Sequence, residues 1–454
     1  MTYDSAVAQL YELGHELSRT PSHKFDLAHM RALLYELGNP QAKFKSVLIA
    51  GTNGKGSTAA TLASILVKAG HKTALYTSPH LVRVNERIRV NGESISDLDF
   101  GRVYEQVEST ASALVANGLL PWHPSFFEML TAMAFCYFAS VGVEIAVLEV
   151  GMGGRLDATN VVEPALAVVT DISLDHQKFL GNTIAEIAAE KAGIIHPGGL
   201  VVTLPQHPAA NDVIGKAVIE RGATAISAVQ YMPPVSPGVE GTVWDQRSSG
   251  GRNQYPLSVM GQQITVDSPL PGRHQLRNLA LAIAAAEQLS FHGVALTPAD
   301  IEAGIRETRW PGRFQVIPAQ DGRPEIVLDV AHNPAGAWAL RSALSERYPD
   351  RRVTLLFAVL RDKAVGEITE ILFPIAEQVI ITVVDNPRAA SPEEVAASSR
   401  MSTDVVLAPD LDGALKRALE LAGRDGFLVI TGSIYLVGAV LSRLNISISQ
   451  KREM

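Results

Sequence analysis

The first group of residues that could do chemistry is a glycine-rich run, Gly51-Thr52-Asn53-Gly54-Lys55-Gly56-Ser57. An apolar stretch typical of a buried strand precedes it, and a helical pattern follows. Glycines let backbone N–H groups approach a phosphate, and a helix N-terminus favours an anion. A lysine can reach terminal phosphates and a hydroxyl can hold Mg²⁺. The spacing departs from GxxxxGK[ST], because Gly56 separates Lys55 from Ser57, so a tight turn with an incidental lysine is the alternative.

A second group follows a later strand. Glu149 ends the apolar run Glu144–Val150, and Gly151-Met152-Gly153-Gly154-Arg155-Leu156-Asp157 comes next. A carboxylate that leaves a strand beside a phosphate loop is placed to hold Mg²⁺. A dinucleotide-binding fingerprint is the rival interpretation, but Leu156 stands where GxGxxG needs glycine.

Two further polar groups lie downstream. Asp175-His176 follows the next strand, where a neutral imidazole would face the expected ligand crevice and could bind a metal; a solvated loop pair is the alternative. Lys191 lies on the apolar stripe of its helix, seven residues after Ile184. A lysine on such a stripe either extends its ammonium to solvent or serves a site.

The C-terminal third contains its own polar group, Asp329-Val330-Ala331-His332-Asn333-Pro334, at the end of a strand. Asn333 could simply cap the following helix, for which Pro334 suits the first position. Weaker signals are Arg313, Asn278 and Thr431-Gly432-Ser433, and the single cysteine, Cys136, lies in an apolar helix and is expected in the core.

Strands and helices must position these groups. Residues 1–40 are expected to be helical, and strands are expected at Phe44–Ala50, Thr73–Ser78, Glu144–Val150, Ala165–Ser173 and Leu200–Pro205, separated by helices, including one from Ser57 to Lys68. Near-continuous apolar strands alternating with helices indicate a parallel sheet covered on both faces. Turn-rich sequence from Val229 to Pro271, which includes Pro233–Gly241 and Ser248–Gln254, predicts a hairpin on that sheet, and an alanine-rich helix, Gln275–Leu289, follows it.

A second series of alternating strands and helices begins after Thr308, with five apolar strands. We therefore predict an α/β protein with a P-loop-containing parallel-sheet N-terminal domain, residues 1–308. A smaller Rossmann-like α/β C-terminal domain is expected at residues 309–454. Arg309–Phe314 is the expected linker.

Composition limits the class of protein. The 454 residues are 47% hydrophobic and 19% charged, with a net charge of −8, which disfavours a disordered chain and a nucleic-acid partner. The longest apolar run is broken by Glu128 and Glu144, so no membrane span is expected. The N-terminus lacks the pattern of a secretion signal, and one cysteine excludes an internal disulfide, so the cytoplasm is the expected location.

Taken together, the motifs resemble the folylpolyglutamate synthase/dihydrofolate synthase family of the Mur ligase superfamily. The matching motifs occur in one order: AGTNGKGS, YTSPHLVRVNERI, LEVGMGGRLDATN, LDHQKFLGNT, EKAGI, HQLRN, WPGRFQ, DVAHNP, LRDK, PRAAS and TGSIYLVG. The Gly56 insertion is the family's own form of the loop. One departure is Asp171-Ile172-Ser173, where the family commonly has serine or threonine before the LDH motif.

The resemblance implies an ATP-dependent amide ligase that acts in folate biosynthesis. ATP converts a pterin-linked carboxylate to an acyl phosphate, and the amine of L-glutamate attacks it; the acceptor is dihydropteroate, a (tetrahydro)folate polyglutamate, or both. Since triphosphate and carboxylate are both anions, two such charges about 4 Å apart repel by roughly 4 kcal/mol at an effective dielectric of 20. Cations must therefore lie between them.

Residue roles follow from the resemblance alone. It implies nucleotide contacts from Gly51 to Thr58, Asn278 and Arg313, and two Mg²⁺ sites formed by Ser57, Ser78, Glu149 and His176, with Lys55 at the β/γ-phosphates. Lys191 matches a lysine that the family carbamylates, and a monovalent cation is a further possibility. Asp329, His332 and Ser433 match positions that engage or order glutamate, while Arg83 belongs to a loop near the folate and Phe126 and Phe127 to its pterin pocket.

Other functions predict other features. A peptidoglycan-type Mur ligase acting on a UDP-muramyl substrate typically has an additional N-terminal domain, whereas only 43 residues precede the strand expected at Phe44. A GTPase-type switch would need an Asn-Lys-x-Asp signature, which the chain lacks. A pure binding module would not explain the metal and phosphate groups together. We expect small-molecule substrates and a monomer.

Overall fold

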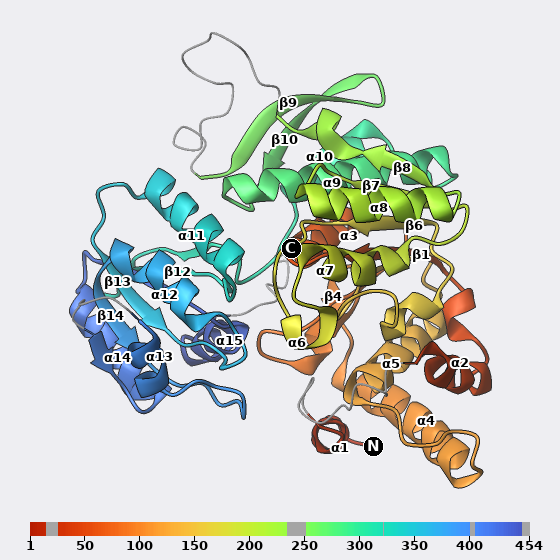
Figure 1. Cartoon of the computed structure of the whole chain (residues 1–454), viewed down its shortest axis with the longest axis horizontal. Coiled ribbons are helices and arrows are strands. Elements are labelled where there is room, and N and C mark those ends of the chain that lie inside the picture. Colours follow the sequence, from red (N-terminus) through yellow and green to blue (C-terminus); the bar gives the residue numbers. More distant parts are fainter. Residues whose placement is uncertain (15–25, 234–250, 321, 400–404, 447–454) are drawn as a thin grey trace.

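The computed structural model describes residues 1–14, 26–233, 251–320, 322–399 and 405–446. Two sheets organise these residues, and each is covered by helices (Figure 1). The first sheet has the order β4-β3-β2-β5-β1-β6-β7-β8, and the second has the order β11-β12-β16-β13-β14-β15. No helix among these residues is long and apolar enough to cross a membrane.

The first sheet places its central strand between two others that matter for the site. Strand β1 (Lys45–Ala50) pairs in parallel with β5 (Ile145–Glu149) on one side and β6 (Leu166–Val169) on the other. Because all three run in parallel, the loops that follow them meet at one edge, where ligands bind in open α/β sheets. The other strands are β2 (Thr73–Tyr76), β3 (Ile88–Val90), β4 (Glu93–Ser94), β7 (Leu200–Thr203) and β8 (Thr224–Ser227).

The first sheet also has an antiparallel edge, which the sequence does not predict. Strands β3 and β4 join through antiparallel pairing, β3 with β2 and β4 with β3. Both are short, and β4 is exposed, so neither has the apolar run that marks a buried strand. The predicted strands are found, mostly with narrower bounds, and the helix expected from Ser57 begins at Lys55.

Helices surround the first sheet on both faces. On one side α1 (Tyr3–Glu12), α2 (Leu27–Glu36), α4 (Asp97–Ala116) and α5 (Phe126–Ser140) form a cluster with a shared core. On the other side α3 (Lys55–Lys68) packs against α9 (Arg273–Phe291) and α10 (Pro298–Arg306). The remaining helices of this part are α6 (Gln177–Leu180), α7 (Ile184–Lys191) and α8 (Pro208–Glu220), with short 3₁₀ turns at 40–42, 84–87, 158–161, 192–194 and 228–231.

The predicted hairpin is present but does not extend the main sheet. Strands β9 (Asn253–Val259) and β10 (Gln262–Ser268) form a separate two-stranded sheet, with the alternating burial of a half-covered ribbon. It packs against α9 and α10 at the top of Figure 1. The expectation therefore needs correction, because helix α10 rather than a sheet edge receives the apolar face of the hairpin. Residues 234–250 of the turn-rich region lie outside the described residues.

The second sheet is mostly parallel, as predicted, with one addition. Strands β12 (Glu325–Leu328), β16 (Phe427–Thr431) and β13 (Val353–Phe357) are neighbours, followed by β14 (Ala376–Ile381) and β15 (Val405–Leu407). Strand β11 (Gln315–Ile317) adds an antiparallel edge. The covering helices are α11 (Pro334–Arg347), α12 (Val365–Leu372), α13 (Pro392–Ser398), α14 (Leu411–Ala422) and α15 (Ile434–Arg443), with a 3₁₀ turn at 373–375.

The part between the two sheets is short. Helix α10 ends at Arg306 and β11 begins at Gln315, so the expected linker, Arg309–Phe314, falls outside regular structure. Its Trp310 lies over the first turn of α3, and Phe314 adopts a left-handed backbone with φ 45°. The domain bounds 1–308 and 309–454 remain a proposal.

Candidate active site between two sheets

A cavity of about 940 Å³ opens where the carboxyl ends of the two sheets face each other. Most of the site residues predicted from the sequence line it. These are Gly51, Thr52, Asn53, Gly54, Lys55, Gly56, Ser57, Ser78, Phe126, Phe127, Glu149, His176, Lys191, Asn278, Arg313, Asp329, His332 and Ser433. Two of the predicted residues, Thr58 and Arg83, do not line it.

The glycine-rich loop is held in place by the loop that follows β6. The carbonyl of Asp171 accepts hydrogen bonds from the backbone N–H groups of Thr52 and Asn53 at 2.8 and 3.1 Å. The Thr52 hydroxyl donates to the carbonyl of Ser173, and the Asn53 amide donates to the Ser173 hydroxyl. The Asp171 side chain, which stands in the segment that departs from the family pattern, pairs with Arg277 of α9. The loop that would hold phosphates is thus fixed before any ligand arrives.

Two glycines of this loop are required by their surroundings. Gly54 has φ 89°, a conformation that side chains rarely adopt, and a Cβ there would lie 2.1 Å from Oδ1 of Asn278. At Gly56 a Cβ would lie 2.8 Å from the ring of Trp310. Gly56, which departs from the common P-loop spacing, must therefore be small because Trp310 of the linker packs directly on the first turn of α3.

Lysines from two helices converge on the same backbone oxygen. Lys55 Nζ donates to the carbonyl of Gly51 at 3.1 Å and to that of Thr52 at 3.2 Å. Lys191 Nζ donates to the same Gly51 carbonyl at 2.8 Å, and its side chain is buried. Burial, and then the charge of Lys55, lowers the pKa of Lys191 to about 7. Lys191 therefore points into the site rather than out to solvent, and much of it is a neutral amine near pH 7.

The residues expected at a metal fit a divalent cation. The carboxylate of Glu149 is buried and accepts the backbone N–H of Ser78 at 3.2 Å, and burial raises its pKa despite the nearby charges of Lys55 and Arg313. Among the described residues Glu149 forms no ion pair, and the Ser57 hydroxyl, which accepts a hydrogen bond from Gln275, faces the same cavity. A buried, unpaired carboxylate beside hydroxyls suits Mg²⁺.

A cation bound here would need further ligands. In the part of the chain that the structure describes, no cluster of three or more histidine, cysteine or acidic side chains is poised to hold a metal. Hydroxyls and phosphate oxygens would therefore complete the coordination, which is the usual arrangement for Mg²⁺ in phosphoryl-transfer sites.

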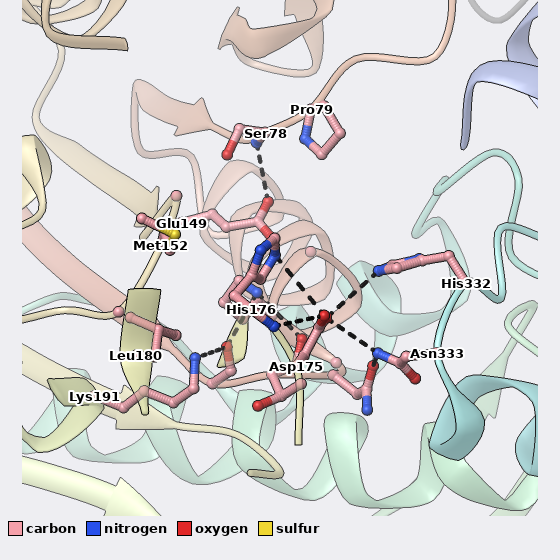
Figure 2. A pocket seen from close by; sticks show the side chains of 18 of the residues that line it. Ser78, Pro79, Glu149, Met152, Asp175, His176, Leu180, Lys191, His332 and Asn333 are labelled. Carbon is pink, nitrogen blue, oxygen red and sulfur yellow. Dashed lines mark hydrogen bonds and ion pairs between the residues drawn. The ribbon is translucent and has the colours of Figure 1, made fainter. Parts of the chain in front are cut away.

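Asp175 is the centre of a polar group that bridges the two sheets (Figure 2). Its carboxylate accepts a hydrogen bond from Nζ of Lys363 at 2.7 Å, and His332 Nε2 lies 3.8 Å from it. His176, which begins α6 with φ 50°, has its Nε2 4.0 Å away. Burial, together with the charge of Lys363, lowers the pKa of His176 to about 3 and that of His332 to about 4. Both imidazoles are therefore neutral at pH 7, and a neutral imidazole nitrogen can bind a metal.

Residues from the second sheet close the cavity. Asp329 Oδ2 accepts from the backbone N–H of Phe314 at 2.8 Å, and its Oδ1 accepts from that of Ala331 at 2.9 Å. Its carboxylate thus fixes the linker next to Arg313. Ser433 caps α15 by accepting from the N–H of Tyr435, so its hydroxyl retains its own proton to donate.

The residues predicted to contact the substrate, Phe126, Phe127 and Arg83, differ in burial and in whether they face the cavity. Phe126 is enclosed between the stacked ring of Tyr11 and the guanidinium of Arg87. Phe127 is less buried and lies against Gly151, where a Cβ would be 2.6 Å from its ring. Arg83 pairs with Asp97 at 2.8 Å on the surface, because the loop turns its side chain away from the cavity. Its assignment to substrate remains a prediction that this geometry does not favour.

Thr58 lies one residue beyond the part of α3 that faces the cavity. Its side chain is fully buried, and its hydroxyl has no hydrogen-bond partner in the described part of the chain. A nucleotide contact from this hydroxyl would require movement of the helix start, and its assignment stays a prediction.

Sequence reasoning did not assign roles to three residues at the centre of the site. In the sequence, Asp175 stands out only as the neighbour of His176, Asn333 only as a possible helix cap, and Lys363 only as part of a matching motif. Asn333 does cap α11 through Gly336, but its amide also donates to Asn53 Oδ1 at 3.0 Å. The available signal was their position: each follows a strand whose carboxyl end faces the cavity.

Comparison with known proteins agrees with this geometry. Residues 49–286 match the family model of the Mur ligase middle domain, and residues 312–434 match that of the Mur ligase, glutamate ligase domain. A Bacillus subtilis protein named dihydrofolate synthase/folylpolyglutamate synthase is 34% identical over 421 residues, covering 92% of this chain and 94% of its own.

Solved structures of similar proteins cover nearly the whole chain. The Mycobacterium tuberculosis folylpolyglutamate synthase complexed with ADP has a TM-score of 0.86 at 32% identity, covering 98% of this chain and 99% of its own. Escherichia coli FolC in complex with DHPP and ADP has a TM-score of 0.80 at 28% identity and covers 98% of each chain. With its phosphate loop, its buried carboxylate and its second sheet arranged in this way, the chain belongs to the folylpolyglutamate synthase/dihydrofolate synthase family of Mur ligases.

Proposed function

We propose that this protein is an ATP-dependent amide ligase that adds L-glutamate to dihydropteroate, to (tetrahydro)folate polyglutamates, or to both. The observation that carries the proposal is that the phosphate loop, the buried Glu149 and the polar groups of the second sheet line one cavity. The relatives solved with ADP, one of them also with DHPP, support a nucleotide and a second small molecule as ligands of this cavity. A peptidoglycan-type acceptor is not favoured by these relatives.

The reaction divides the work between the two sheets. The carboxylate of the pterin-linked acid attacks the γ-phosphorus of ATP, which forms an acyl phosphate and releases ADP. The neutral amine of glutamate then attacks the acyl carbon, an amide bond forms, and phosphate leaves with the C–O bond electrons. Acyl-phosphate formation needs positive charge beside the phosphates, and the attack needs the glutamate amine held next to the acyl carbon. The nucleotide and the glutamate must therefore meet at the junction between the two sheets.

Residues of the first sheet would supply the positive charge. Backbone N–H groups of Gly54 to Ser57 and the ammonium of Lys55 would hold the phosphates of ATP. Ser57, Ser78, Glu149 and His176 would hold Mg²⁺, which when bound neutralises phosphate charge and polarises the reacting oxygens. Two such ions, and a monovalent cation, remain predictions. Arg313 and Asn278, which face the same cavity, would contact the nucleotide.

Lys191 would act as a carboxylate after reaction with CO₂. Its neutral amine forms an N–C bond to CO₂ and loses a proton to solvent, and a carbamate results. A pKa of about 7 makes the neutral amine abundant near pH 7. The product would lie beside Gly51 and would add a negative charge where a second cation could bind.

Residues of the second sheet would receive glutamate. Ser433 and His332 face the cavity from the ends of β16 and β12, where they would contact or order the glutamate. Asp329 would act indirectly, since both its oxygens accept backbone N–H groups of the linker region.

The test is the incorporation of labelled glutamate with ATP and Mg²⁺, with dihydropteroate and a reduced folate offered in separate reactions. Incorporation into one or both acceptors, matched by equimolar ADP, is the expected result and identifies the preferred acceptor. Incorporation into neither, together with turnover on a UDP-muramyl substrate, would replace this function with the peptidoglycan-type one.

A further inference from the structure

A buried ion pair joins the two halves of the molecule. Lys363 follows β13 of the second sheet, and its Nζ lies 2.7 Å from Oδ1 of Asp175, which follows β6 of the first sheet. The two side chains are only 7% and 9% exposed. The residues are 188 positions apart in the chain, so the pair forms only when the two sheets face each other as they do here.

The same carboxylate connects to the phosphate loop through an amide. Asn333 Nδ2 lies 3.4 Å from Asp175 Oδ2 and donates to Asn53 Oδ1 at 3.0 Å. His332 also approaches Asp175, and Figure 2 shows His332 and Asn333 on the same side of this carboxylate. With Lys363, three side chains that follow strands of the second sheet converge on one carboxylate of the first. A change in the orientation of the second sheet would disturb the loop through these contacts.

Lys363 is the cation that matters in this group near neutral pH. Lys363 Nζ lies 2.7 Å from Asp175 Oδ1, whereas Nε2 of His332 and Nε2 of His176 lie 3.8 and 4.0 Å from Asp175 Oδ2. Removing the Lys363 ammonium would leave a buried, unpaired carboxylate, which the molecule can relieve by opening the junction to water.

We propose that the Lys363–Asp175 pair is a latch that holds the C-terminal sheet over the phosphate loop, which makes Lys363 a positioning residue for the ligase reaction. A buried ion pair suits a reversible latch because its mutual attraction roughly offsets the desolvation of its charges. The latch brings His332 and Ser433 to the end of the cavity where the phosphates bind. This rests on the proposed function, in which those two residues receive glutamate.

The test combines kinetics with a direct measure of orientation. Lys363→Met, Asp175→Asn and the double variant are compared for the KM of glutamate, the Kd of ADP, and energy transfer between dyes on Ile219→Cys and Lys416→Cys. Those two sites are exposed on opposite halves, and the native Cys136 is buried and escapes labelling. We expect Lys363→Met to broaden the distance distribution and raise the glutamate KM at least tenfold, with the ADP Kd changed less than about threefold.

The double variant separates a latch from a direct substrate contact. A latch predicts that Lys363→Met adds little once Asp175→Asn is present, because either change opens the same pair. Lys363→Arg keeps the charge and should restore part of the narrow distribution. Independent effects of the two substitutions on the glutamate KM, or an unchanged distance distribution in Lys363→Met, would overturn the latch.

A matched control is a second ion pair that also crosses the junction. Arg273 of α9 lies 2.8 Å from Glu346 of α11, but its side chain is 67% exposed. Solvent screens such a pair, so Arg273→Met should leave the distance distribution and the glutamate KM unchanged. Failure of the proposed function would appear separately, as absence of glutamate incorporation by the unaltered protein, since the energy-transfer and ADP measurements do not require that reaction.

Discussion

Lys191 is buried, although burial disfavours the charged form of its amine. Its side chain is only 4% exposed, and burial with the nearby Lys55 lowers its pKa from 10.5 to about 7. A side chain used only for packing would be better served by an apolar residue of similar length. A stability cost at one residue is typical of a functional site, which supports the proposed role of this amine.

Lys191→Met should therefore abolish turnover and raise stability. The unfolded chain binds the Lys191 proton up to a pKa near 10.5, whereas the folded chain releases it near pH 7, so the stability of the unaltered protein rises with pH across that interval. The gain from the substitution should be about 1–3 kcal/mol at pH 6 and shrink toward pH 10. Urea unfolding at several pH values measures it.

Lys216→Met serves as the control for this comparison, because the Lys216 side chain is 75% exposed on α8. It should change neither turnover nor the pH dependence of stability. Full turnover of Lys191→Met at saturating Mg²⁺ would refute the assigned role, and a loss of stability at pH 6 would refute the stated cost of burial.

Individual site residues can be predicted from the sequence where their type contrasts with that of their neighbours in the chain. Lys191 stands out against the apolar stripe of its own helix, and Lys55 against its glycines. Lys363 and Asp175 show no such contrast, because each lies in a polar loop and their pairing depends on how the two sheets face each other. Arg83 was assigned from its position in a loop, and only the fold shows that its side chain pairs with Asp97.

Among the elements, helix α3 matters most because it carries Lys55 to Ser57 at its start. It packs closely on α10 at Gly304, where a Cβ would lie 2.4 Å from Cα of Ile65. The Ser64 hydroxyl also donates to the Gly304 carbonyl at 2.7 Å. This close backbone contact fixes where the phosphate loop ends and the helix begins.

Gly304→Ala should displace α3 and weaken nucleotide binding. The added methyl group meets backbone, which cannot rotate away, so we expect the free energy of unfolding to fall by about 2 kcal/mol and the ADP Kd to rise. Gly215→Ala in α8 is the control, since its Cβ would meet nothing within 4 Å and better helix propensity should stabilise by about 0.5–1 kcal/mol. Calorimetry with ADP titration measures both; equal behaviour of the two variants would contradict the packing argument.

The elements that sequence reasoning predicted share one property, a continuous apolar run. Strands β5 and β13 are buried along their whole length and β1 is buried after Lys45, and the sequence predicts all three. Strand β8 is largely exposed and β4 has two exposed residues, so neither shows hydrophobic patterning. The hairpin was predicted from its turns, but its partner could not be, because packing on α10 depends on tertiary contacts.

For the whole molecule, a net charge of −8 says little about the cavity. Lys55, Lys363 and Arg313 all line the junction between the sheets. Local positive charge of this kind suits anionic substrates, and it comes from both halves. The arrangement of the two halves is thus the property on which the site depends most.

A contact far from the ion pair offers an independent test of that arrangement. The loop after β2 reaches the second half through Leu81, whose carbonyl lies against Gly438 on α15; a Cβ on Gly438 would be 1.8 Å from that oxygen. Glu86 fixes the loop by accepting hydrogen bonds from the backbone N–H groups of Leu81 and Val82, each at 2.9 Å.

Neither the Leu81 loop nor helix α15 can move easily, so Gly438→Ala must push the two halves apart. We expect kcat/KM for glutamate to fall about 100-fold, while the ADP Kd changes little. Gly413→Ala on α14, where the nearest atom would be 3.4 Å away, should behave like the unaltered protein. Full activity of Gly438→Ala would mean that the ligase tolerates a wider junction, whereas loss of ADP binding would mean that the substitution damages the first half instead of the arrangement between halves.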